Sequence, residues 1–148
     1  MPLARYALYA QGVELYVAPT WDCGDGWVGT MQHIAREGRC WVVGSGTALR
    51  ASEIPEDLPG RDQLFPDAEE WVNSGDSVVV EPGGALATEP LHRANGIVFA
   101  EVDAAAVAVA RRSLDVAGHY ARPDVLQLRI NREPQSPYVE VEARPAGE

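Results

Sequence analysis

Residues 13–47 give the clearest signals for secondary structure and read VELYVAPTWDCGDGWVGTMQHIAREGRCWVVGSGT. At its start, Val13, Leu15 and Val17 alternate with more polar side chains, which is the period of a β-strand. Pro19 is expected to end this strand, because proline cannot donate to a ladder of backbone hydrogen bonds. A β-strand is therefore predicted over Val13–Ala18.

A helix and a second strand follow in the same stretch. Apolar residues recur at the i, i+4, i+7 and i+8 spacing of one helix face: Trp27, Met31, Ile34 and Ala35. Asp25 is expected to cap the helix and Gly38 to close it. The nearly unbroken apolar run Cys40–Thr47 is typical of a strand covered on both faces. Strand–helix–strand with such short joints predicts parallel pairing and a right-handed crossover.

The segments around this unit give weaker signals. Pro2 suits the first turn of a helix that Gly12 would stop, so a helix is predicted over residues 2–11. Residues 50–75 are rich in proline and acidic side chains and are predicted to form a surface excursion with one helical turn at Asp67–Trp71. A strand over Ser77–Glu81 and a tight turn at residues 82–84 predict a hairpin.

The last third of the chain is predicted to hold one strand and one helix. Gly96–Val102 is predicted as a strand, and Asp103 as the cap of a helix over Ala104–Arg112. Loops or a short strand follow from Asp115, and residues 132–148 are predicted to be a disordered tail. The expected fold is a mixed α/β sheet with its helices mainly on one face.

Composition limits the classes of function. The 148 residues, 46% apolar, predict one globular domain. The formal charge of −10 argues against partners that are nucleic acids or anionic membranes, and no run is long enough to span a bilayer. Two cysteines and no apolar leader favour a cytoplasmic location. All 12 basic residues are arginine, so this chain offers no lysine amine for catalysis.

No cofactor or metal site is predicted. Three histidines (His33, His92, His119) and two cysteines lack metal-ligand spacing, and a calcium loop starting at Asp22 would place His33 where glutamate is required. Cys23 lies near a predicted helix N-terminus, where the helix dipole lowers a thiol pKa. No base is placed beside Cys23 by the sequence, so a pocket or surface role is favoured over a nucleophilic one.

Several long phrases carry a resemblance to a known family. They are residues 1–22 (MPLARYALYAQGVELYVAPTWD), 31–38 (MQHIAREG), 75–84 (GDSVVVEPGG) and 118–125 (GHYARPDV). In order and spacing they resemble nitrilases, the carbon–nitrogen hydrolases that cleave nitriles. The resemblance covers about residues 1–131, which it identifies as the C-terminal portion of a carbon–nitrogen hydrolase domain.

The resemblance implies a reaction whose catalytic residues lie elsewhere. Nitrilases use a Glu–Lys–Cys triad, and the nucleophile stands in a Cys-Trp-Glu-Asn-Tyr segment just before the phrase that opens this chain. Cys23 and Cys40 are therefore not the family nucleophile, and no catalytic residue is expected here. The chain is expected to be part of a nitrilase that hydrolyses nitriles to carboxylic acids and ammonia. The alternative is a non-catalytic assembly subunit that pairs with a complete partner.

The resemblance also implies a fold, an interface and a site. The fold is part of the family's α-β-β-α sandwich, with homo-oligomers formed through helices 2–11 and 26–37 and an insertion at 50–75. Thr20, Trp21 and Trp27 correspond to positions around the substrate pocket, although packing alone would equally explain both tryptophans. His119 and Asp124 are expected to fix the C-terminal segment by hydrogen bonds.

Overall fold

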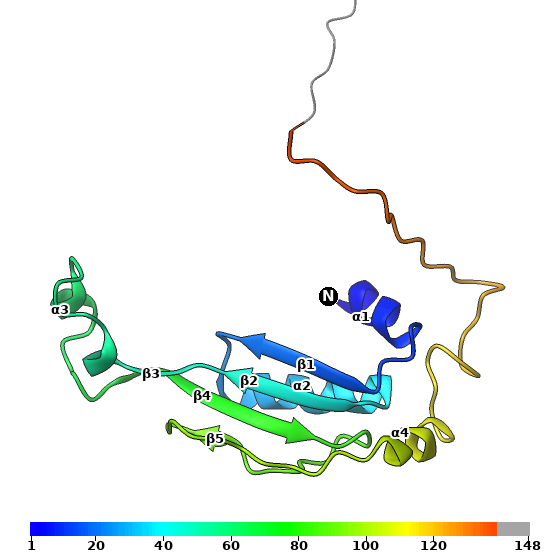
Figure 1. Cartoon of the computed structure of the whole chain (residues 1–148), viewed down its shortest axis with the longest axis horizontal. Helices are drawn as coiled ribbons and strands as arrows, with labels where there is room; N and C mark the ends of the chain where they lie inside the picture. The colour runs from blue at the N-terminus through cyan, green and yellow to red at the C-terminus, as the bar shows by residue number, and fades with distance from the viewer. Residues whose placement is uncertain (139–148) are drawn as a thin grey trace, which may run out of the picture.

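A computed structural model describes residues 1–138, which form one mixed sheet with helices packed on it (Figure 1). The helices are α1 (Pro2–Tyr9), α2 (Gly24–Gly38), α3 (Arg61–Leu64) and α4 (Ala104–Arg111), with a 3-10 turn at Ala51–Glu53. The strands are β1 (Leu15–Thr20), β2 (Trp41–Gly46), β3 (Ala48–Arg50), β4 (Trp71–Val80) and β5 (Leu91–His92). Their order in the sheet is β1-β2-β4-β3, with β5 paired to β4.

Strands β1 and β2 are parallel neighbours, as the sequence predicts, with Leu15 opposite Trp41 and Val17 opposite Val43. The predicted end at Pro19 is wrong, since β1 continues to Thr20. Strand β1 lies at the edge of the sheet. Proline is tolerated there because its missing N–H faces no partner strand.

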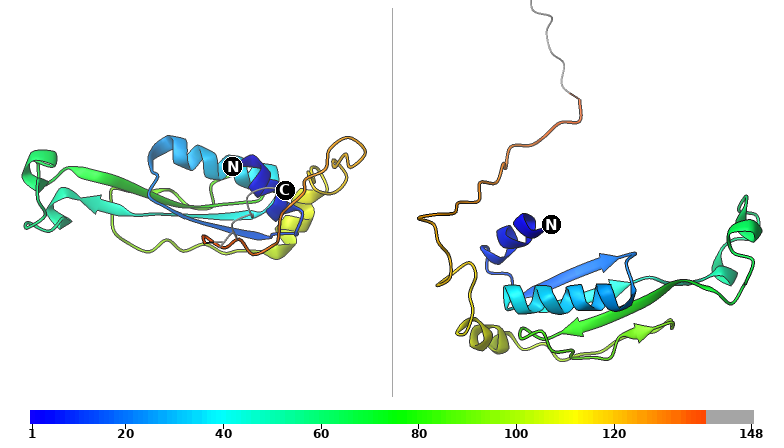
Figure 2. Two further views of the ribbon diagram at one scale, coloured as in Figure 1. Left: turned by 90° about the horizontal axis from the view of Figure 1, so that it is seen from above. Right: turned by 180° about the vertical axis from the view of Figure 1, so that it is seen from behind.

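The two faces of the sheet carry different layers (Figure 2). On one face α2 packs its predicted apolar residues against the sheet, and this cluster contains Tyr9, Trp27, Met31, Ile34, Ala35, Cys40, Val42, Val78 and Val80. On the other face Val107 of α4 packs with Trp41 and Val79, and Val98 packs beside them. The expectation of helices mainly on one face thus holds for α2 but not for α4.

The ends of the first two helices differ from the predicted ones. Helix α1 stops at Tyr9, and Gly12, with φ of 77°, lies in the turn that follows. Cys23, not Asp25, is the N-cap of α2, and Arg39 takes the left-handed conformation expected of Gly38. Gly38 is required for a different reason, because a β-carbon there would overlap the Tyr9 ring.

Residues 48–74 form an arm that extends beyond the rest of the sheet (Figure 1). Strand β3 pairs antiparallel with Trp71–Ser74 of β4, and the Arg50 guanidinium lies 4.6 Å from the centre of the Trp71 ring. The predicted helical turn at Asp67–Trp71 is wrong: the turn is α3, and β4 already begins at Trp71. The start of β4 could not be predicted from the sequence, because its first residues are strand only through their pairing with β3.

The second half of the chain keeps the predicted turn and helix but not the predicted strand. Glu81 and Ala85 close the turn after β4, and the Asp103 carboxylate accepts a bond from the Ala105 N–H, 2.8 Å away, at the start of α4. Gly96–Val102 is not a strand. It crosses the sheet face with Val98 inward, while Ile97 and Phe99 are exposed.

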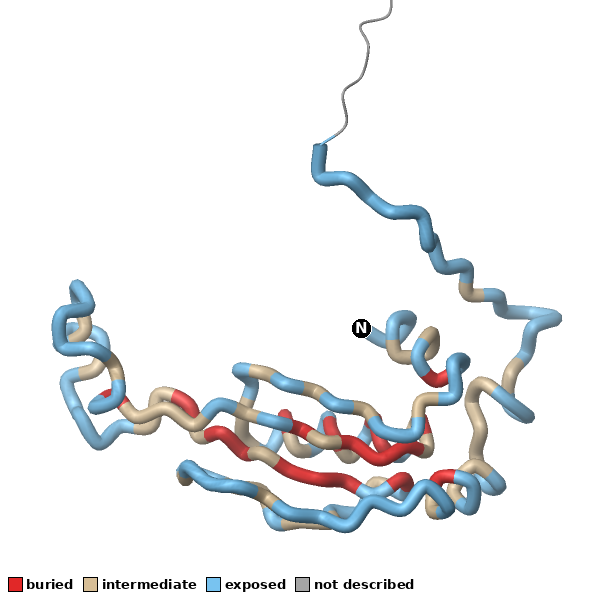
Figure 3. The backbone as a smooth tube through the Cα atoms, in the orientation of Figure 1, coloured by how far each residue is buried: buried red, intermediate tan, exposed pale blue. Residues whose placement is uncertain are grey.

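Buried residues concentrate in β2, β4 and α2, whereas β1 and the region after α4 are largely exposed or half-buried (Figure 3). Residues 113–138 contain turns but no helix or strand. The tail predicted to be disordered, 132–148, lies outside the described residues from 139 onward.

Candidate functional site

Strand β1 and its parallel neighbour β2 end at the same edge of the sheet, where the chain turns from Thr20 into α2. Ligands of open α/β sheets bind outside the carboxyl ends of such strands. The turn over residues 20–24 carries two of the predicted site residues, Thr20 and Trp21. Residues 20–24 are called the edge turn below.

Hydrogen bonds from inside the turn and from β4 fix the edge turn. The Asp22 N–H donates to Thr20 Oγ1 at 3.0 Å. Asn73 Nδ2 donates to the Trp21 carbonyl. The Gly24 N–H donates to Asp76 Oδ2 at 2.8 Å, so two side chains of one strand hold the turn at both ends.

Asp76 is a buried carboxylate, with 3% of its surface exposed. Besides the Gly24 N–H, it accepts a bond from Ser74 Oγ, and His92 Nδ1 of β5 lies 2.6 Å from Oδ1. Burial acts to raise the pKa of Asp76, but these hydrogen bonds and the charge of His92 outweigh burial and leave that pKa below its ordinary value. Asp76 is therefore an ionised group that joins β4, β5 and α2.

The backbone of β4 bends to place these side chains. Gly75 and Asp76 both have positive φ, 83° and 60°, and Asn73 Oδ1 accepts the Gly75 N–H at 2.9 Å. Aspartate tolerates the left-handed region better than most residues do. The irregularity lets Asn73 and Asp76 both reach the edge turn.

The predicted site residues do not all share one environment. Thr20 and Trp21 lie together in the edge turn, and the Trp21 side chain is exposed. Trp27, on α2, is 8% exposed and packs beneath Gly44 of β2. Its indole Nε1 is buried and has no hydrogen-bond partner within residues 1–138.

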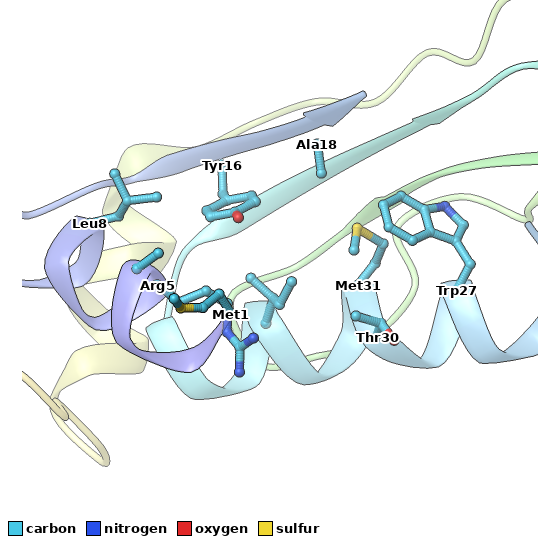
Figure 4. A pocket seen from close by; sticks show the side chains of 10 residues that line it. Met1, Arg5, Leu8, Tyr16, Ala18, Trp27, Thr30 and Met31 are labelled. Atoms are coloured by element: carbon cyan, nitrogen blue, oxygen red, sulfur yellow. The ribbon is translucent and has the colours of Figure 1, made fainter. Parts of the chain in front are cut away.

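Trp27 also borders a groove between α1, β1 and α2, with a volume of about 230 Å³ (Figure 4). Tyr16, Ala18 and Met31 line the groove together with Trp27, and Leu8 and Arg5 of α1 form its opposite wall. At the far end of α2, Glu37 accepts bonds from Arg5 Nε and Tyr9 Oη, each at 2.9 Å. The groove is mostly apolar, and its lining contains no cysteine, histidine or carboxylate side chain.

Cys40 is a core residue, and His119 and Asp124 have local partners. Cys40 is fully buried, and burial raises the pKa of its thiol to about 11 despite the nearby Arg111. The His119 ring contacts the neighbouring Tyr120 ring at a tilt of 53°, and Asp124 pairs with Arg122. The prediction that His119 and Asp124 fix the C-terminal segment to another element is therefore wrong. Over residues 1–138 no three histidine, cysteine or acidic side chains gather to hold a metal ion.

The roles of Asn73, Asp76 and His92 in holding the edge turn were not predicted from the sequence. A signal for the first two was present, since Asn73-Ser74-Gly75-Asp76-Ser77 is a polar interruption immediately before the apolar run Val78–Val80. Polar residues within a buried strand must find partners, which marks them as structural or functional. His92 gave no comparable signal, because its pairing with Asp76 depends on the path of β5.

The fold is similar to that of a known class of hydrolase. A carbon–nitrogen hydrolase from Helicobacter pylori G27 superposes with a TM-score of 0.58 at 15% identity, covering 77% of this chain and 40% of that one. The chain therefore has part of the carbon–nitrogen hydrolase fold, as expected. No family model matches the sequence.

In sequence, the chain is similar to nitrilases. An aliphatic nitrilase of Sinorhizobium fredii (strain HH103) is 40% identical over 139 residues, which is 94% of this chain and 44% of that protein. Nitrilase 2 of Arabidopsis thaliana is 41% identical over 143 residues, 93% of this chain and 41% of that protein. Nearly the whole chain is thus similar to part of a nitrilase, and it spans less than half the length of these relatives.

Proposed function

We propose that the chain is the C-terminal portion of a nitrilase whose complete form hydrolyses nitriles to carboxylic acids and ammonia. One observation carries this proposal: nearly the whole chain matches nitrilases at about 40% identity while spanning less than half of each. The family order of the matched phrases supports the C-terminal position. On this proposal residues 1–148 contribute structure and part of the substrate wall.

Nitrile hydrolysis needs catalytic groups that residues 1–148 do not supply. A nitrile carbon is a weak electrophile, so attack by a thiol needs a base for the sulfur proton and a cation or donor for charge on the nitrogen. This chain contains no lysine, and Cys40 is a core thiol whose pKa is raised to about 11. The upstream portion of the protein is proposed to supply the Glu–Lys–Cys triad.

The edge turn is proposed to form part of the substrate pocket. Thr20 and Trp21 stand at the carboxyl ends of parallel strands, and Trp21 leaves its indole exposed for contact. Trp27 is proposed to contribute indirectly, by packing against Gly44 of β2 and so supporting the strands that carry the pocket. An exposed aromatic ring is suited to apolar or aromatic nitriles.

The open face of β1 supports association with the rest of the protein. Leu15 and Val17 are 46% and 59% exposed, although they continue the face that Trp41 and Val43 form on β2. A covering layer from the upstream portion would bury this apolar strip.

We propose that the complete protein is located in the cytoplasm. Within residues 1–138 no helix has the length and apolar character to cross a bilayer.

Homo-oligomers are proposed to form through α1 and α2. Leu3 of α1 is 62% exposed, whereas Trp27 and Met31 of α2 face the chain's own sheet. An interface on these helices would therefore use α1 and the outer side of α2. Charge substitutions at Trp27 or Met31 test folding, not the interface.

The test begins by reading the DNA upstream of Met1 for an in-frame Cys-Trp-Glu-Asn-Tyr segment. The upstream portion is then co-expressed with residues 1–148, and ammonia release from aromatic, aliphatic and arylacetonitriles is measured. Activity of the pair, with none from either part alone, is expected. Co-purification of a folded pair without nitrile turnover would contradict the proposal and favour a non-catalytic assembly subunit.

A further inference from the structure

Two polar side chains of β4, Asn73 and Asp76, are buried to the same degree, with 3% of their surface exposed. Both reach across to the edge turn, although each bond joins residues 52 positions apart in the sequence. Asn73 binds the Trp21 carbonyl, and Asp76 binds the Gly24 N–H. The residues that flank the Trp21 side chain are thereby fixed by β4 and not by the turn alone.

The buried carboxylate of Asp76 depends on the groups that bond to it. Burying an ionised carboxylate is costly unless it is paired and hydrogen-bonded. Within residues 1–138, the imidazole of His92 pairs with Asp76, and its Nδ1 lies 2.6 Å from Oδ1. Asp76 in turn uses its second oxygen for Gly24 and Ser74. The Asp76 carboxylate thus links His92 of β5 to Gly24, the first residue of α2.

We propose that His92 and Asp76 are positioning residues for the substrate wall: His92 orients the Asp76 carboxylate, and that carboxylate, with Asn73, sets the edge turn and the place of Trp21. This inference rests on the proposed function for the role of Trp21 toward a nitrile. The positioning itself can be measured without any turnover.

His92 is a suitable residue to test because its side chain is 54% exposed. Replacing it leaves no buried cavity, and Asp76 keeps the bonds from Gly24 and Ser74, so the fold is expected to survive. His92→Leu removes the donor at similar size. His92→Asn keeps an N–H donor near the position of Nδ1 without a titrating ring. The pair of variants separates the hydrogen bond from the bulk of the side chain.

The experiment uses the full chain labelled with 5-fluorotryptophan and follows the fluorine NMR resonance of Trp21, assigned with Trp21→Phe. His92→Leu and Asp76→Asn are expected to shift or broaden this resonance. His92→Asn is expected to leave it near the wild-type position. Glu37→Gln is the matched control, because it removes a similar carboxylate hub at the opposite end of α2. An unshifted Trp21 resonance in folded His92→Leu would overturn the proposal.

A second readout connects the positioning to substrate. In the pair reassembled with the upstream portion, His92→Leu is expected to raise KM about tenfold with a smaller change in kcat, the size set by losing one hydrogen bond. His92→Asn should restore KM. A shifted Trp21 resonance with unchanged KM would contradict the placement of Trp21 in the substrate wall. It would leave the proposed nitrilase activity itself intact, since that activity is measured by ammonia release.

Discussion

At the scale of single residues, Gly38 shows how closely α1 and α2 approach. Its φ is negative, so conformational freedom does not explain it; the Tyr9 ring occupies the space that a β-carbon would need. Tyr9 cannot easily move, because its hydroxyl donates to Glu37 while Arg5 holds the same oxygen. Contact between the two helices thus depends on the absence of one methyl group.

Gly38→Ala is expected to lower the free energy of unfolding by about 1–3 kcal/mol, the usual cost of overpacking. Gly29→Ala is the matched control on the same helix, because nothing lies within 4 Å of its β-carbon position. There the better helix propensity of alanine should raise stability by up to ~1 kcal/mol. Urea denaturation followed by circular dichroism measures both variants. Equal effects of the two substitutions would contradict the close approach of Tyr9.

Asp76 gives a prediction about pH. Its pKa is lower in the folded chain than the usual value of about 3.9 for an unfolded aspartate. Its contribution to stability is therefore complete above that usual value and is lost as pH falls through the lowered folded-state pKa. Stability measured between about pH 5 and pH 2 should fall less steeply in Asp76→Asn than in the wild type. Parallel curves would contradict the ionised state of Asp76.

At the scale of elements, β1 divides its two faces between the chain's own core and an open surface. Tyr16 and Ala18 face α2, whereas Leu15 and Val17 point to the opposite side and remain exposed. Val43 of β2 lies between Val17 and the segment that carries Ile97, so the open strip continues across the sheet. Adjacent residues of one strand thus perform different tasks.

Val17→Arg is expected to leave the chain folded, with a change in unfolding free energy within about 0.5 kcal/mol, as for other exposed positions. It should nevertheless block association with the upstream portion, since it places a charge on the apolar strip. Ala18→Arg, one residue along, should cost about 2 kcal/mol or more, because it forces a charge against α2. Denaturation and co-purification measure the two effects. Normal co-purification of Val17→Arg would contradict the role of this face.

Much of this arrangement follows from sequence period. The alternation over Val13–Val17 and the helical spacing from Trp27 to Ala35 predicted β1, α2 and their parallel crossover, because each pattern lies within a few neighbouring residues. The length of β4 and the irregular path of Gly96–Val102 could not be predicted, since both depend on partners far away in the sequence. In the site, the position of Thr20 and Trp21 at the end of a strand could be predicted. The bond between His92 and Asp76 could not.

At the scale of the whole molecule, the chain is a sheet with a long helix packed on one face and a smaller layer on the other. Helix α2 packs on the first face, and α4 and the segment around Val98 cover part of the second. Ile97 and Phe99, together with Leu15 and Val17, remain exposed around that second face. The formal charge of −10 opposes association only at long range and is screened by salt.

The isolated chain is therefore expected to self-associate at high micromolar concentration, and more strongly as salt is added. Sedimentation velocity over a series of concentrations and salt levels measures this association. Leu15→Glu and Val17→Glu together should shift the distribution towards the monomer. A monomer at all concentrations in high salt would contradict an unfilled apolar face.

The most direct test of the proposed function is ammonia release from nitriles by residues 1–148 alone and together with the upstream portion. We expect no release above the buffer background by the chain alone, and turnover once the upstream portion is restored. We also expect Cys23→Ser and Cys40→Ser to leave the restored turnover largely intact, since neither thiol is proposed to attack the substrate. Turnover by the chain alone that Cys23→Ser abolishes would contradict the proposed function.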